Sequence, residues 1–256
     1  MADPSPAPAA GEVEALAASL LGAERALLLS GNDLVTPGRA RADRGEWAGW
    51  AERANLEAFL TDPGRFWQFL LPLAEEIAVR QVAPVHRAIA RLERAGLIWG
   101  HVTQGVDRLH RRAGSPDPVE VYGHLLSAVC TRCGERYGLP EVRSLVEAAD
   151  DQVPRCTVCG YPLRPQGTLW HEPLPPDALT RAWALAGEAD LLVVLDSDLR
   201  TAPVSLLPSV PLTRGAALVV LGPHPTQYDR YARQVVHAGS APLVTALADL
   251  LVPEPP

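Results

Sequence analysis

Four cysteines, the only ones in the chain, are arranged as two Cys-x2-Cys pairs. Cys130 and Cys133 form the first pair, and Cys156 and Cys159 form the second after 22 intervening residues. Each such pair forms a tight turn that presents two thiolates to one ion, and two pairs complete a tetrahedral Zn(II) shell. A pair of disulfides is the alternative, but no secretory signal is apparent and two adjacent pairs suit a metal better. The spacing predicts a structural zinc site with no position open for a catalytic water.

The residues before the first cysteine pair form a second pattern. The segment TQGVDRLHRRAGS (103–115) is followed by VEVYG (119–123), and Cys130 lies eight residues after Tyr122. This arrangement resembles the sirtuin family of NAD-dependent protein deacylases, which reads TQNxDxLHxxAG, then ExHG, then the cysteine pair. Further similar segments are FLTDPGRFWQF (59–69), APVHRAIARLE (83–93), 191–203 and 217–226. The resemblance implies a nucleotide-binding sheet joined to a zinc module.

The same resemblance assigns candidate catalytic residues. Gln104 and Asp107 match the family's TQNxD segment, and Tyr122 stands where the family has its catalytic histidine. In sirtuins that histidine takes a proton from the nicotinamide ribose, which suits imidazole because its pKa lies near neutrality. A phenol with a pKa of about 10 is a poor base at pH 7. His124 is a less favoured candidate for the missing base. On an extended segment its side chain would point to the same side as that of Tyr122, roughly 6–7 Å further along.

The candidate NAD-binding residues depart further from the family pattern GAGxSxxSGIPDFRG. Residues 31–45 keep Gly31, Arg44 and Gly45, but Asp33 stands at the second glycine, where its carboxylate would repel a pyrophosphate by about 4 kcal/mol at 4 Å and an effective dielectric of 20. Ser197 keeps the middle hydroxyl of the family's GTS. Gly105 and Gly222 replace two asparagines that position ribose. We therefore expect NAD binding to be weakened or lost.

Strands that alternate with helices predict an α/β fold with a doubly wound parallel sheet. The resemblance implies that this sheet is Rossmann-like and carries a small four-cysteine zinc-binding and helical module. The expected strands are 26–30, 96–103, 191–195, 216–221 and 234–237, and the expected helices include 11–21, 177–187 and 242–251. We assign 1–10 to a disordered tail, and 11–45, 95–125 and 165–252 to the large domain. The small module then comprises a helical part, 46–94, and a zinc arm, 126–164.

Composition limits the classes of partner. The formal net charge of −7 argues against nucleic acid, and no apolar run reaches the length of a membrane span, so we expect a cytoplasmic protein. The chain has no lysine, so it cannot carry an acyl-lysine of its own. Aromatic residues gather in 46–94, where they form either a helical core packed on the sheet or a channel for an acyl group. The expected partner is another protein.

These observations favour a degenerate sirtuin, a pseudoenzyme that acts as an interaction or regulatory subunit. The alternative is an NAD-dependent protein-lysine deacylase or ADP-ribosyltransferase with a rearranged active site. A third possibility is a module that binds a small molecule or acyl-lysine without turnover. Four acids at or beside the family's NAD positions, namely Asp33, Asp43, Asp196 and Asp198, suggest a crevice that binds a cation or a partner's arginine.

Overall fold

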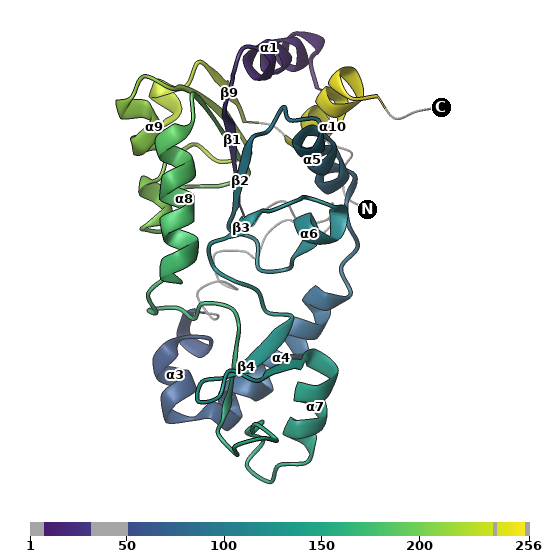
Figure 1. The fold of residues 1–256 in the computed structure, drawn as a ribbon, viewed down its shortest axis with the longest axis vertical. Coiled ribbons are helices and arrows are strands. Elements are labelled where there is room, and N and C mark those ends of the chain that lie inside the picture. Colours follow the sequence, from purple (N-terminus) through teal and green to yellow (C-terminus); the bar gives the residue numbers. More distant parts are fainter. Residues whose placement is uncertain (1–7, 32–50, 238–239, 254–256) are drawn as a thin grey trace.

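The computed structural model describes residues 8–31, 51–237 and 240–253. Figure 1 shows two parts, one above the other along the long axis. The upper part is a six-stranded parallel sheet in the order β3-β2-β1-β7-β8-β9. These strands are β3 (Val119–Glu120), β2 (Gly100–Thr103), β1 (Ala26–Ser30), β7 (Leu191–Leu195), β8 (Ala217–Leu221) and β9 (Gln234–Val236). The predicted doubly wound sheet is confirmed.

The two central strands are buried along their whole length. Every residue of β1 and of β7 is buried, which is why both read as continuous apolar runs rather than as alternating patterns. Ser30 pairs with Thr103 of β2 and with Leu195 of β7, and Leu195 pairs with Leu221 of β8. The carboxyl ends of these four strands are therefore level with one another.

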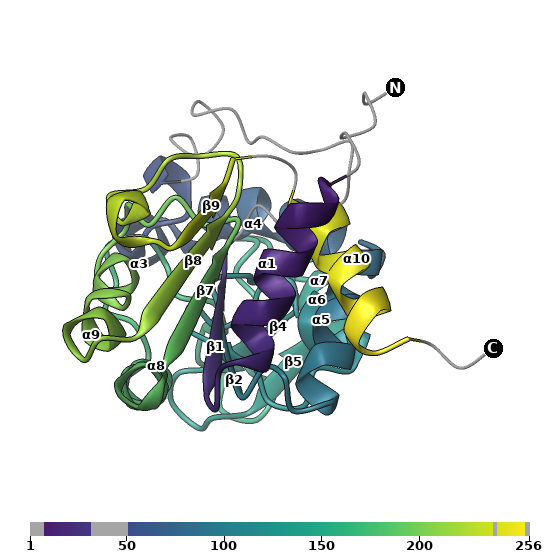
Figure 2. The same ribbon diagram turned by 90° about the horizontal axis from the view of Figure 1, so that it is seen from above.

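Helices cover both faces of the sheet, as Figure 2 shows from above. One face packs against α1 (Ala10–Leu21), α5 (Pro84–Arg94) and α10 (Ser240–Leu251). The other packs against α8 (Pro176–Glu188) and α9 (Ser209–Thr213). The structure differs from the prediction in α5. Its buried residues Val85, Ile89 and Leu92 join the core of the large domain, whereas 46–94 was assigned to the small module.

The small module is built from two distant parts of the chain. The helices α3 (Leu56–Thr61) and α4 (Pro63–Ala78) pack against α7 (Leu139–Glu147) and an antiparallel sheet of β5 (Arg136–Gly138), β4 (Ser127–Cys130) and β6 (Leu163–Pro165). Phe66 and Trp67 are buried in this core, and the Trp67 indole donates to the Leu163 carbonyl at 3.1 Å. These aromatic residues therefore form a core with the zinc arm rather than against the large sheet. Trp47 and Trp50 lie outside the described residues.

The two chain segments that enter the small module are joined to each other. Leu56 N–H donates to the Trp170 carbonyl at 3.1 Å, and Trp170 N–H donates to the Ala54 carbonyl at 3.2 Å. Both backbone groups of Trp170 are used in this bridge, so a peptide that adds a strand here must pair with other residues. Within the described parts of the chain, every helix is too short or too polar to cross a membrane.

Candidate functional site

The four cysteine sulfurs converge at the tip of the small module. All four Sγ atoms lie within 4.8 Å of one another, and the Cys130–Cys159 and Cys133–Cys156 pairs are 3.5 Å apart. A tetrahedral shell with Zn–S bonds of about 2.3 Å requires sulfurs separated by about 3.8 Å, so the arrangement fits zinc.

The backbone around each cysteine pair holds the sulfurs in this geometry. Gly134 N–H donates to the Cys130 carbonyl, and Gly160 N–H donates to the Cys156 carbonyl at 2.8 Å. Both glycines have positive φ angles, 79° and 72°, which close the two turns. The Tyr137 hydroxyl donates to Cys156 Sγ at 3.2 Å, a contact that the spacing of the cysteines did not predict. Such contacts to the sulfur orient a ligand in a metal site.

At the other candidate site, a row of residues continues the sheet beyond its carboxyl edge. Gln104 N–H donates to the Ser30 carbonyl, Gly31 N–H to Leu195, Asp196 N–H to Leu221 and Gly222 N–H to Val236, at distances of 2.7 to 3.0 Å. The row Gln104, Gly31, Asp196, Gly222 thus crosses β2, β1, β7 and β8 in order. The strand order reverses between β1 and β7, and ligands of open α/β sheets bind at such a point.

Glycine is needed at one position in this row because of its neighbour. A Cβ atom on Gly31 would overlap the carbonyl oxygen of Asp196. The close approach brings the ends of β1 and β7 together directly below the place where a ligand would cross them. Gly31, a predicted cofactor residue, therefore lies at the centre of the row.

Three predicted site residues, one of them in the row, form a hydrogen-bonded chain. Ser197 Oγ donates to Gln104 Oε1 at 2.6 Å, and the Gln104 side chain also hydrogen bonds with the Tyr122 hydroxyl. Burial raises the pKa of Tyr122 above 10, and the hydrogen bond from Gln104 offsets this only in part. Tyr122 is therefore a neutral phenol at pH 7, and its ability to accept a proton from a substrate hydroxyl is lower than that of an exposed tyrosine.

The other two candidates for proton transfer have different surroundings. His124 follows a turn in which Gly123 has a φ of 65°, so the segment is not extended there and the spacing given for an extended segment does not apply. Burial lowers the pKa of His124 to about 4, and Arg108 contributes to the shift. Its Nδ1 accepts from Leu126 N–H at 3.3 Å. Asp107 accepts from Leu109 N–H at 2.9 Å, at the start of the short helix α6 (Leu109–Ala113), and so shapes the loop rather than joining the chain of Gln104.

Several sequence-predicted residues cannot be placed. Asp33, Asp43 and Arg44 lie outside the described residues. Of the acids proposed to line a cation crevice, Asp196 is buried and accepts from Ser240, whereas Asp198 keeps 44% of its side chain exposed near Arg200.

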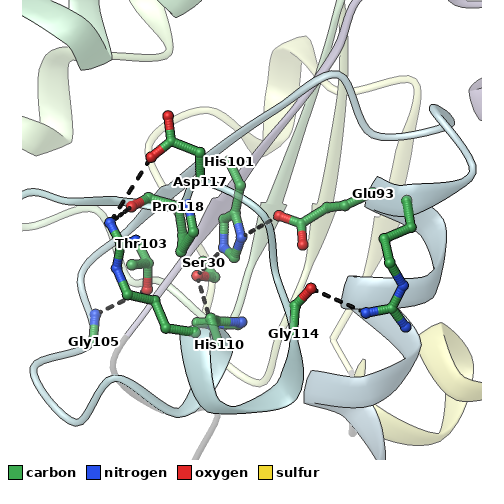
Figure 3. A network of polar contacts seen from close by, with 11 residues as sticks. Ser30, Glu93, His101, Thr103, Gly105, His110, Gly114, Asp117 and Pro118 are labelled. Carbon is green, nitrogen blue, oxygen red and sulfur yellow. Dashed lines mark hydrogen bonds and ion pairs between the residues drawn. The ribbon is translucent and has the colours of Figure 1, made fainter.

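Beneath the row lies a buried polar network that the sequence patterns did not predict. Figure 3 shows Ser30 between two imidazole rings: its Oγ lies 2.9 Å from His101 Nε2 and 3.2 Å from His110 Nε2. His101 Nδ1 lies 2.8 Å from a carboxylate oxygen of Glu93. The His86 ring packs edge-on against His110 at 4.9 Å between centroids.

This network has the connectivity of a hydrolytic Ser-His-Glu triad, but its burial excludes that chemistry. Ser30 exposes none of its surface and His101 exposes 3%, so a substrate carbonyl cannot reach the hydroxyl. When His101 is neutral and donates from Nδ1 to Glu93, its Nε2 accepts from Ser30 and His110 donates to Ser30 in turn. His110 Nδ1 then carries no proton, which matches its lack of a partner among the described residues. The network therefore supports the floor of the site.

Acid is expected to destabilise the fold through this network. Burial lowers the pKa of His110 well below 6.5, and burial also lowers that of His86, so the native state keeps both rings neutral where the unfolded chain takes up protons. Stability is then unaffected above pH 6.5 and falls below it, by about 1.4 kcal/mol per pH unit for each ring until its native pKa is reached. Urea unfolding between pH 7.5 and 5.5 measures this slope.

His110→Gln should reduce that slope, whereas His224→Gln, at an exposed position, should leave it unchanged. The comparison between variants also separates the effect from loss of zinc in acid, because that loss affects both equally. An unchanged slope in His110→Gln would show that the ring is protonated in the native state.

Comparison with known proteins identifies the family. The model described as Sir2 family matches residues 41–203. An NAD-dependent protein deacetylase 1 of Pyrobaculum aerophilum is 34% identical over 78% of each chain. An NAD-dependent protein deacylase of Thermus thermophilus is 33% identical over 91% of each. A solved structure of Sir2 bound to an acetylated peptide superposes with a TM-score of 0.86 at 26% identity, covering 94% of this chain and 99% of the other. The chain therefore belongs to the Sir2 family, the sirtuins.

Proposed function

We propose that the chain is an NAD-dependent protein deacylase that removes acyl groups from lysines of other proteins. The relatives named above support this activity by their names, which are those of deacetylases and deacylases. The observation that carries the proposal is the bond of Ser197 Oγ to Gln104 Oε1, at 2.6 Å. This bond joins the ends of β7 and β2 across β1, where a dinucleotide would lie. It also holds the side-chain amide of Gln104 in an orientation that faces Tyr122.

NAD would supply a ribose carbon whose leaving group, nicotinamide, departs as a neutral molecule without needing a proton. Gln104 would orient the ribose and the acyl oxygen. Removal of a proton from a ribose hydroxyl is a separate task, and the raised pKa of Tyr122 makes this phenol poorly suited to it. We therefore expect a burst of about one nicotinamide per enzyme molecule, followed by slow formation of deacylated peptide, because the site is free for a second NAD only after the slow later step is complete.

The second candidate is a pseudoenzyme that regulates a protein partner, and the raised pKa of Tyr122 favours it. An ADP-ribosyltransferase is a third candidate, since it would release nicotinamide without removing an acyl group. In each case the expected partner is another protein; for the deacylase this follows because the chain contains no lysine to serve as its own substrate. We also propose a cytoplasmic location.

The deciding experiment measures nicotinamide release from NAD by zinc-loaded protein, with and without an acetyl-lysine peptide. A deacylase should release nicotinamide only when the peptide is present, together with a slower release of free lysine peptide. Because the chain has no lysine, its own side chains cannot supply a background acyl group. Release without the peptide would favour ADP-ribosyl transfer, and no release at millimolar NAD would favour the pseudoenzyme.

A further inference from the structure

Asp196 is an acid in the row at the carboxyl edge of the sheet, and its backbone is held in an unusual conformation. It directly follows β7 with a φ of 51°, in the left-handed region that aspartate and asparagine enter more readily than most residues. The residue is 8% exposed, and its Oδ2 accepts from Ser240 Oγ at 2.6 Å. Ser240 is the first residue of α10, whose positive N-terminal end favours a carboxylate.

The other carboxylate oxygen occupies space that a neighbouring residue leaves empty. Gly222 follows β8, and a Cβ atom built there would lie 3.2 Å from Asp196 Oδ1 and 3.1 Å from Asp196 Cα. The side chain missing at Gly222 is therefore replaced in space by the carboxylate of Asp196. An oxygen acceptor thus lies across the end of β8, although β8 is followed by glycine.

The position of the reacting groups shows which half of a dinucleotide would lie here. The chain of Ser197, Gln104 and Tyr122 runs from the end of β7, next to Asp196, towards β2 and the segment after β3, and so away from β8. This step rests on the proposed function, which puts the nicotinamide ribose at that chain. The dinucleotide must then extend over β7 and β8, which brings its adenosine ribose to Asp196 and Gly222.

A carboxylate is suited to a ribose diol. Each carboxylate oxygen can accept more than one hydrogen bond, so a ribose hydroxyl can share an oxygen with a group that already donates to it. It repels a 2′-phosphate, which is how acids at the ends of strands in Rossmann folds select NAD over NADP. Burial strengthens both effects, because water screens the charge less.

We propose that Asp196 binds the adenosine ribose of NAD and excludes NADP, replacing a side chain that Gly222 does not have. The acid is then a ligand-binding and specificity-determining residue.

The test measures binding of NAD, NADP and ADP-ribose by calorimetry to the parent protein and to Asp196→Asn. Asparagine has nearly the same shape, tolerates the left-handed conformation and removes only the charge. The parent should bind NAD about a hundredfold more tightly than NADP. In Asp196→Asn, NAD should bind about tenfold more weakly and the preference over NADP should nearly disappear. The matched control is Asp249→Asn, which removes one charge from an exposed residue of α10 that pairs with Arg91 of α5.

The outcomes separate this inference from the proposed function. Tight NAD binding that is unchanged in Asp196→Asn, with NADP still excluded, would overturn the inference alone. If binding follows the expected pattern but no nicotinamide is released, the role of Asp196 in binding ribose stands and the proposed deacylase activity is overturned. If the parent binds neither NAD nor ADP-ribose, both are overturned. A circular dichroism melt of Asp196→Asn close to that of the parent shows that the variant is folded.

Discussion

Replacing Tyr122 by histidine is expected to raise the rate of peptide deacylation by about 10²–10⁴, the usual contribution of a well-placed general base. Burial raises the pKa of the phenol above 10, whereas an imidazole has an ordinary pKa near 6.5. A mismatch of more than three pKa units corresponds to about 4 kcal/mol or more of proton-transfer free energy at pH 7. The measurement is the rate of free lysine peptide formation at saturating NAD, with nicotinamide release recorded in parallel.

Only the later step, removal of the proton from the ribose hydroxyl, should respond to the substitution. Measuring both products therefore shows which step has changed. The initial burst of nicotinamide should change little in Tyr122→His, whereas the formation of deacylated peptide that follows it should accelerate. Tyr122→Phe is the matched control: it keeps the ring and removes the hydroxyl, and should leave the low deacylation rate of the parent unchanged. Complete loss of activity in Tyr122→Phe would contradict the argument and assign the phenol a direct role. His124→Ala should also have little effect, because Nδ1 of His124 already accepts a backbone hydrogen bond.

Removal of zinc is expected to unfold the zinc arm while the large domain remains folded. The arm's strands are short, three or four residues each, and two of its buried core residues, Cys130 and Cys156, are themselves ligands. Structural zinc contributes apparent binding free energies of about 10–16 kcal/mol in small zinc-finger peptides, and so much stabilisation cannot be lost without local unfolding. The large sheet has its own two cores and shares none of these ligands.

Trypsin provides the measurement, since the chain has no lysine and every trypsin site is an arginine. With a strong chelator, cleavage at the exposed Arg132 and at Arg143 on α7 should accelerate by at least about tenfold, whereas cleavage at Arg181 on α8 should not. Cys156→Ser should reproduce the effect without chelator. Resistance of Arg143 to cleavage in the metal-free protein would show that the packing of α7 on α4 is sufficient by itself.

Local sequence signals were enough for the sheet and the zinc ligands. The limits predicted for strands 26–30 and 191–195 match β1 and β7, because a fully buried parallel strand has an unmistakable apolar composition. The strand predicted at 96–103 begins only at Gly100, since an apolar run does not mark where pairing starts. The cysteine pairs converge as their spacing required.

Contacts between distant segments could not be predicted in the same way. The helix α5 is amphipathic, but an apolar face does not reveal which of two cores it joins, so its assignment to the small module was wrong. Glu93 and His101 are eight residues apart, and they meet because α5 lies against the end of β2. The approach of Asp196 to Gly222 depends on the register of β7 with β8, which no local pattern specifies.

The division of the small module between two chain segments sets an order of assembly. Its core joins α4, which ends at Ala78, to β6, which begins at Leu163. At about 5–20 residues per second, a ribosome needs about 4–17 s to make the intervening residues. Until β6 is made, the core around Phe66 and Trp67 is incomplete, and until Cys159 is made, so is the set of zinc ligands. Nascent chains are therefore most prone to aggregate between these two points, and zinc supply should govern the yield of folded protein as well as the stability of the arm.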